Sequence, residues 1–229
     1  KLRVEGKTAV VNGQKFYTTG ALLAHIVPIV AVDEEGKGWL AFADRDAPGL
    51  TVVNDWSSFG QRTTASGSIR IENVRVPLDR VVPVAAFERP TAAGAISQII
   101  QSAIDAGIAA AAIAETIAFV RTRSRPWIDS GKDSASDDPF TISAIGDLVI
   151  RLHAAEALLE RAGRAIDVAL AEPRDETVNQ ATLVTSESKV LTTEVAIAAT
   201  NKLFELAGTR ATLKEHNLDR HWRNARTHT

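Results

Sequence analysis

The period of the hydrophobic residues changes near Pro90, and this change constrains the fold more than any other feature of the chain. Up to about Val84, apolar residues fall in short runs of strand length that are separated by turn signals. After Pro90, apolar residues recur every three or four positions over stretches of roughly 30 residues, which is the period of a helix. The sequence therefore predicts an α+β chain, with a β-domain over residues 1–87 and a helical domain over residues 88–229.

The β-domain is expected to be a small antiparallel barrel or sandwich, because its turn signals recur at short intervals. Asn12-Gly13 lies between the runs Thr8–Val11 and Gln14–Thr19 and predicts a two-residue hairpin. Further strands are predicted at Val27–Val32, Trp39–Phe42 and Ser68–Val76. The inward-facing residues of the last strand should be Ile69, Ile71 and Val74.

The helical domain is expected to be an up-and-down four-helix bundle. Its predicted helices are Thr91–Arg125, Thr141–Ala171, Glu176–Ala207 and a shorter one from Leu218. Apolar residues of the first helix recur at three- and four-residue steps with mostly alanine between them, which predicts a long helix packed closely on several sides. These residues are Ile96, Ile99, Ile100, Ile104, Ile108, Ile113, Ile117 and Val120. The first and third helices carry more apolar positions than one bundle needs, so a homo-oligomer is expected.

Composition excludes several classes of function. The 26 basic and 28 acidic side chains give a formal charge of −2, which leaves no broad basic face for nucleic acid. The chain has no cysteine, so redox chemistry would need a bound cofactor. The longest uncharged apolar stretch, Ala106–Ala114, is much shorter than the ~20 residues that span a bilayer. We therefore expect a cytoplasmic protein with no membrane anchor, and the start at Lys1 indicates a fragment.

The sequence contains no Walker loop and no GxGxxG, HExxH or GxSxG motif. His216, His221 and His228 instead crowd the end of the chain, with arginines between them. Those arginines disfavour a dication, so no metal site is predicted. Two interpretations stay open for this helix: it is either a solvated basic helix or a helix that faces an anion or another ligand.

Three other segments have both a structural and a ligand-binding interpretation. Phe16–Gly20 is either a Thr-rich strand or a source of hydroxyls and amides for a planar heterocycle. Trp56–Ser68 is either a plain loop or a hydroxyl-rich turn that binds a ligand. Arg123–Trp127 either caps a helix or clamps a phosphate with guanidinium groups.

Taken together in this order, these segments resemble the acyl-CoA dehydrogenase superfamily. The matching segments are Lys15–Gly20, Val74–Pro77 and Arg223–Arg226. Within the superfamily the chain is most similar to the flavin-dependent monooxygenase branch, which includes dibenzothiophene monooxygenases and sulfur-acquisition oxidoreductases. The segments typical of that branch are Gly60–Gly67, Arg125–Trp127, Asp138–Thr141 and Asp219–Thr229. The resemblance implies that an N-terminal helical domain and a C-terminal tail are missing from this sequence.

The resemblance also implies roles for individual residues. The residues that would line the flavin ring are Phe16, Tyr17, Thr18, Thr19 and Gly20. Those that would border the substrate are Trp56, Ala65 and Ser66. Arg125, Thr209 and Arg210 would hold the flavin phosphate, with Arg125 reaching across a subunit boundary. His228 would face the flavin and act as the catalytic residue.

The function that this resemblance implies is oxidation of a small or aromatic organosulfur compound by O2 and reduced FMN. A separate NAD(P)H-dependent flavin reductase would supply the reduced FMN to a homotetramer. The alternative is an FAD-dependent acyl-CoA dehydrogenase, and a third possibility is a non-catalytic bundle. A Glu-Gly pair after Thr229 would favour dehydrogenation, and a His-Asp pair there would favour oxygenation.

Overall fold

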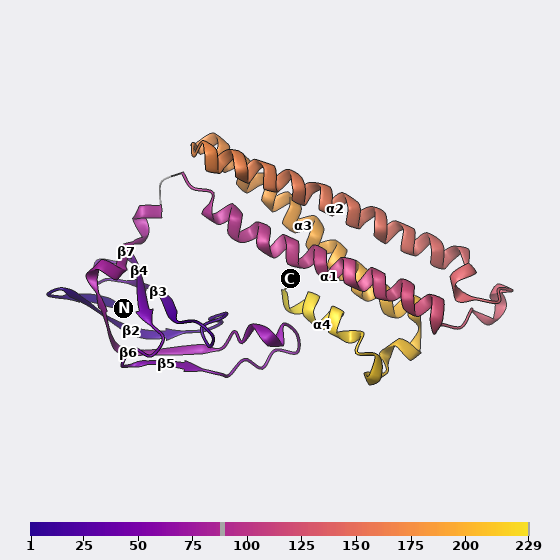
Figure 1. Cartoon of the computed structure of the whole chain (residues 1–229), viewed down its shortest axis with the longest axis horizontal. Helices are drawn as coiled ribbons and strands as arrows, with labels where there is room; N and C mark the ends of the chain where they lie inside the picture. Colours follow the sequence, from indigo (N-terminus) through magenta and orange to yellow (C-terminus); the bar gives the residue numbers. More distant parts are fainter. Residues whose placement is uncertain (88–89, 229) are drawn as a thin grey trace. The chain divides into compact units, whose positions relative to one another are not determined.

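The computed structural model describes residues 1–87 and 90–228. The chain divides into two compact units, Lys1–Arg89 and Pro90–Thr229 (Figure 1). The sequence predicts a domain boundary between residues 87 and 88. Residues 88 and 89 are outside the described part of the chain, so this boundary stays a prediction. The order of an antiparallel β-unit followed by a helical bundle confirms the predicted arrangement along the chain.

The β-unit consists of two antiparallel sheets, with strand orders β1-β2-β6-β5 and β3-β4-β7. The strands are β1 (Leu2–Glu5), β2 (Thr8–Lys15), β3 (Ile26–Val32), β4 (Gly38–Asp44), β5 (Leu50–Val53), β6 (Ser68–Pro77) and β7 (Val81–Pro83). Both sheets contribute side chains to one hydrophobic core. The predicted inward residues of β6, Ile69, Ile71 and Val74, are at most 3% exposed, which confirms the alternation.

The predicted hairpin at Asn12-Gly13 is wrong. β2 continues through both residues and pairs with β1 along one edge and with β6 along the other. The register against β6 shifts between Val11 and Gly13, so the two residues form an irregularity inside a central strand. Asn12 Oδ1 accepts a hydrogen bond of 2.8 Å from the Asn73 backbone N–H on β6. Pairing with a distant strand has therefore overridden the local turn signal.

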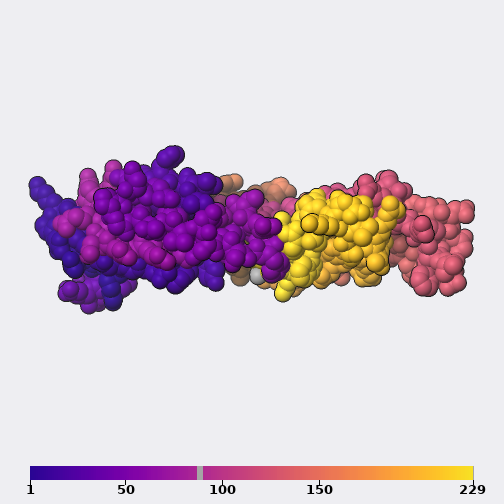
Figure 2. Space-filling model, turned by 90° about the horizontal axis from the view of Figure 1, so that it is seen from below, coloured from indigo at the N-terminus to yellow at the C-terminus, as the bar shows by residue number. Residues whose placement is uncertain are grey.

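The helical unit contains three long helices and one short helix. They are α1 (Ala93–Thr122), α2 (Pro139–Ala171), α3 (Asp175–Ala207) and α4 (Asp219–His228). α3 packs against both α1 and α2, and α4 contacts α1 and α3 (Figure 1). Gly208, with φ of 77°, ends α3 at the predicted position. Figure 2 shows α4 and the turns before it as a continuous yellow surface of this unit.

The buried residues of α1 include four alanines, Ala95, Ala106, Ala109 and Ala112, and one isoleucine, Ile113. Ala109 and Ala112 are fully buried, whereas Ile100 is 54% exposed and Ile104 is 40% exposed. Small side chains allow α1 and α3 to pack closely, and Ile96, Ile100 and Ile104 in the first half of α1 are exposed. Ile113 is buried, and Ile99, Ile108 and Ile117 are partly buried against the cores of this unit, so α1 is packed on more than one side while its exposed isoleucines leave one side open.

Within the described residues, α1 is the one helix whose length and composition would suffice to cross a membrane. The same composition is found in core helices of bundles, and α1 packs extensively against α3 and α2. It also carries Asp105, whose side chain is fully buried among groups of this unit. The packing therefore accounts for the apolar composition of α1.

Replacing Gly49 with alanine is expected to destabilise the β-unit. Gly49 has φ of 85°, and a Cβ atom there would overlap the backbone carbonyl oxygen of Glu72 on β6. Left-handed strain and overpacking together should lower the free energy of unfolding by about 2–4 kcal/mol, measured by urea denaturation. Gly6→Ala is the matched control, because Gly6 has φ of 62° but no atom within 4 Å of its Cβ position. Equal losses in both variants would show that the overlap contributes nothing.

Candidate functional site

In the β-unit, the predicted flavin-lining segment lies against the predicted substrate turn. The backbone N–H of Thr18 donates to the Gly67 carbonyl oxygen at 2.9 Å, and the Thr18 hydroxyl donates to the same oxygen at 2.6 Å. The Thr19 and Ser66 hydroxyl oxygens lie 2.8 Å apart. Residues 16–20 and 56–67, called here the hydroxyl-rich loops, therefore form one surface, although β3, β4 and β5 lie between them in the sequence.

The hydroxyl-rich loops also contain aromatic side chains and residues with a strained backbone. The rings of Tyr17 and Trp56 meet edge to face, with centroids 6.2 Å apart. The Trp56 indole Nε1 donates to the Gln61 carbonyl oxygen at 2.9 Å. Tyr17, Gln61 and Ala65 all have positive φ, at 57°, 48° and 46°. Non-glycine residues with this backbone conformation are strained, and such strain concentrates at functional sites.

The predicted ring-lining segment is a loop and not part of a strand, because β2 ends at Lys15. Phe16 and Tyr17 are 62% and 78% exposed, so their aromatic surfaces are open to a ligand. Gly20 donates its N–H to the Thr64 carbonyl oxygen at 3.2 Å, which holds the end of the segment to the turn. The interpretation as an ordinary Thr-rich strand is therefore wrong, and contact with a planar ligand stays a prediction.

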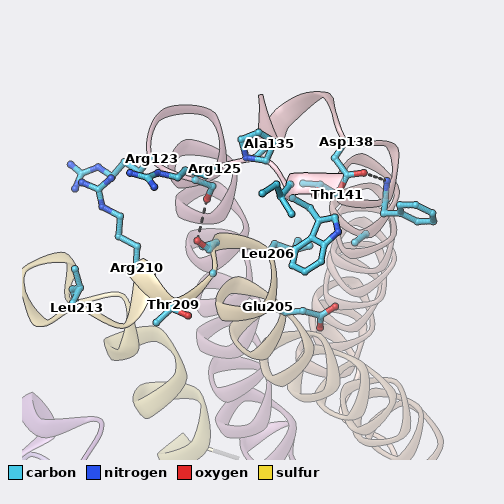
Figure 3. A pocket seen from close by; sticks show the side chains of 18 residues that line it. Arg123, Arg125, Ala135, Asp138, Thr141, Glu205, Leu206, Thr209, Arg210 and Leu213 are labelled. Atoms are coloured by element: carbon cyan, nitrogen blue, oxygen red, sulfur yellow. Dashed lines mark hydrogen bonds between the residues drawn. The ribbon is translucent and has the colours of Figure 1, made fainter. Parts of the chain in front are cut away.

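In the helical unit, a pocket of about 990 Å³ lies between the loops after α1 and α3 and the start of α2. Its lining includes Arg123, Arg125, Trp127, Asp138, Thr141, Thr209 and Arg210. Figure 3 shows the three arginines on one side of the pocket and Asp138 and Thr141 on the other. The Ser124 hydroxyl donates to the Ala207 carbonyl oxygen at 3.1 Å and so ties the loop after α1 to the end of α3. The three predicted phosphate ligands are thereby brought to one pocket.

The arginines of this pocket differ in their partners. Arg123 Nη1 lies 2.9 Å from His216 Nδ1, and its guanidinium group lies over the Phe119 ring. Arg125 and Arg210 are exposed, and neither forms an ion pair with a carboxylate within residues 1–87 and 90–228. Unpaired guanidinium groups bind phosphate or carboxylate oxygens through paired hydrogen bonds. Arg125 and Arg210 are therefore available for an anion, whereas Arg123 serves the local structure.

His228 lies at the end of α4 and is largely buried, with its side chain 11% exposed. Its Nδ1 lies 2.5 Å from Oδ1 of Asp105 on α1. Lys189 Nζ and the Thr193 hydroxyl, both on α3, donate to Asp105 Oδ2 at 2.7 Å and 2.8 Å. The other ring nitrogen of His228, Nε2, is buried and has no hydrogen-bond partner among the described residues.

His221 is also buried against α1. Its Nε2 lies 3.2 Å from Oε2 of Glu115, and Glu115 also pairs with Arg220. Burial lowers the pKa of His221 below its usual value, although Glu115 opposes this effect. Because both histidines are buried against carboxylates of α1, the interpretation of α4 as a solvated basic helix is wrong. Across the described ranges, no three ligating side chains are grouped to hold a metal ion.

Sequence reasoning missed Asp105. Its side chain is fully buried, which raises its pKa, but donors from His228, Lys189 and Thr193 outweigh this and leave the pKa below its usual value. The carboxyl group is therefore ionised at neutral pH. The available signal was that Asp105 is the only charged residue between Ala93 and Ala114. An isolated acid in an alanine-rich helix indicates a buried, paired charge.

Residues 99–229 match the family described as acyl-CoA dehydrogenase, C-terminal domain, which covers more than half of the chain. The chain belongs to the acyl-CoA dehydrogenase family. It is 33% identical to the probable FMNH2-dependent monooxygenase SfnC of Pseudomonas putida, over 95% of this chain and 57% of that protein. It is 32% identical to dibenzothiophene monooxygenase of Mycolicibacterium goodii, over 95% of this chain and 56% of that protein.

The fold is similar to that of TdsC from Paenibacillus sp. A11-2, whose crystal structure holds FMN and indole. The TM-score is 0.92 at 29% identity, covering 100% of this chain and 62% of TdsC. The resemblance predicted from the sequence is therefore confirmed. The chain spans little more than half the length of the curated relatives that it matches.

Proposed function

We propose that the full-length protein is a flavin-dependent monooxygenase that uses reduced FMN and O2 to oxidise a small or aromatic organosulfur compound. The similarity to SfnC, whose name specifies FMNH2, supports the cofactor. The similarity to dibenzothiophene monooxygenase supports the substrate class. Because this chain is about half the length of those proteins, the activity of the whole enzyme is part of the proposal.

Each unit, taken by itself, offers groups that suit one part of a flavin. Arg125 and Arg210 are unpaired with carboxylates in the described part of the chain, and they line one pocket with Thr209, which suits a phosphate group. The exposed aromatic rings of Phe16 and Tyr17 and the hydroxyl-rich loops suit a planar ring. When bound, the flavin would supply the activation of O2 and the oxygen transfer. The protein's residues would bind, orient and shield it.

The observation that carries this proposal is His228 Nε2, which is buried and unpartnered among the described residues while Nδ1 contacts Asp105. A histidine held in this way can give or take a proton at one defined atom. The alternative, an FAD-dependent acyl-CoA dehydrogenase, requires a carboxylate base. Asp105 does not suit that task, because three donors hold it and its pKa is low. The choice of oxygenation over dehydrogenation is supported by the similarity to SfnC and to dibenzothiophene monooxygenase.

The test is oxygen consumption by the full-length protein with reduced FMN. An NAD(P)H-dependent flavin reductase, the expected partner in the cytoplasm, would regenerate the reduced FMN. Sulfides, sulfones and acyl-CoA thioesters form the substrate panel. We expect an oxygenated product from an organosulfur compound and none from the thioesters. Reduction of bound FAD by a thioester without O2 would instead establish the dehydrogenase.

We also propose that the full-length protein is a homotetramer. The helical unit exposes apolar side chains on α1 and α3, including Ile100, Leu183 and Val190, which are 54–59% exposed. Trp127 and Phe140 beside the pocket are 72% and 81% exposed. Apolar surface of this extent favours association of subunits. Light scattering at micromolar concentration should give the mass of a tetramer, and a clean monomer would contradict the proposal.

A further inference from the structure

The buried carboxylate of Asp105 uses its two oxygen atoms differently. Oδ2 accepts hydrogen bonds from Lys189 and Thr193, and Oδ1 faces Nδ1 of His228 at 2.5 Å. We propose that Asp105 is a positioning residue, which fixes both the ring orientation of His228 and the nitrogen that carries its proton. The consequence for turnover rests on the proposed function, whereas the position of the proton does not.

The chemistry of the groups determines where the proton lies. An ionised carboxylate only accepts hydrogen bonds, so His228 Nδ1 must carry a hydrogen and donate it to Oδ1. In the neutral ring, Nε2 then has the free lone pair, and it is the buried nitrogen with no partner in the described residues. Lys189 supplies the counter-charge of Asp105, so the carboxylate stays ionised whether or not His228 carries a second proton.

A purely structural role for Asp105 would be to fasten α4 to α1. Glu115 already makes such a contact, because it pairs with Arg220 and lies 3.2 Å from His221 Nε2. Glu115 is 37% exposed, so its contact requires little desolvation, whereas the Asp105 side chain is fully buried. Burying a carboxylate is costly, and an apolar pair would fasten the helix as well. The buried charge is better explained by its control of the His228 ring.

The full-length enzyme offers a readout that does not depend on activity. Long-range proton–nitrogen NMR correlations of the histidine rings, recorded where histidines are neutral, should show His228 protonated at Nδ1. In Asp105→Asn, Lys189 and Thr193 should keep the amide oxygen on their side and direct the NH2 group at His228. Nδ1 must then accept, and the proton should move to Nε2. Observation of the Nε2–H tautomer in the wild type would overturn the proposal without any variant.

The kinetic consequence is tested with the same variant. Asp105→Asn should lower kcat by about 10- to 100-fold, as loss of a group that orients a functional histidine does, with KM and reduced-FMN affinity within about threefold. Glu115→Gln is the matched control, because it removes the carboxylate beside the other buried histidine of α4, and it should retain kcat. An equal loss of kcat in both variants would show that Asp105 only anchors α4 to α1. A wild type without oxygenase activity would refute the proposed function alone, because the tautomer measurement would still stand.

Discussion

Replacing His228 with asparagine in the full-length enzyme is expected to lower turnover by about 10²- to 10⁴-fold, the usual contribution of a positioned acid–base group. The asparagine amide N–H can take the place of Nδ1–H and donate to Asp105, which keeps α4 in position. The variant lacks any group at the place of Nε2. Reduced FMN should therefore bind nearly normally while the reaction loses its proton donor or acceptor.

The measurement is product formed per O2 consumed, together with hydrogen peroxide released. We expect the variant to consume O2 without product, so that peroxide accounts for most of the oxygen. His153→Ala is a suitable control, because His153 is an exposed histidine on α2, and this change should leave coupling intact. Product formation by His228→Asn within about threefold of the parent would make His228 a structural residue.

Replacing Arg125 or Arg210 with alanine should weaken flavin binding by about ten- to a hundred-fold in each single variant. A charge-assisted hydrogen bond contributes roughly 1.5–3 kcal/mol, and neither arginine has a carboxylate partner in the described chain that would compete for it. Because both side chains are exposed, the thermal stability of the unliganded protein should change little. Fluorescence titration with FMN measures the affinity directly.

Arg151→Ala provides the matched control for this experiment. Arg151 is also exposed, but it pairs with Asp147 on α2 at 2.7 Å and lies outside the pocket lining. Its removal should leave flavin affinity unchanged. If Arg125→Ala and Arg210→Ala also bind flavin like the parent, the two residues serve only as charged groups near helix ends.

The sequence predicted the fold well where the hydrophobic period alone determines the element. The second helix was expected at Thr141–Ala171 and is found at Pro139–Ala171, because Pro173 and the apolar period both limit it. The Asn12-Gly13 prediction failed because a dipeptide signal reports only local preference. Pairing of β2 with β6 contributes more to the stability of the β-unit than a two-residue turn could. No local sequence pattern encodes that pairing.

The candidate site was predicted in part. Arg125, Thr209 and Arg210 were grouped by resemblance, and they do line one pocket. Asp105 was missed because its partners, Lys189, Thr193 and His228, come from two other helices. Asp105 stands out as the only charged residue between Ala93 and Ala114, but no local pattern names its partners, and only the packing of α1, α3 and α4 reveals the cluster. Convergence of this kind is invisible to a scan for short motifs.

The alanine core between α1 and α3 has a consequence for how such an enzyme can change. Ala109 and Ala112 have no exposed surface and lie one and two turns after Asp105 on α1. A larger side chain at either position would push the two helices apart, and Asp105 would separate from Lys189 and Thr193. Substitutions in loops and on exposed faces leave this cluster untouched, whereas the volume of these two residues is tied to the contacts that hold His228 against Asp105.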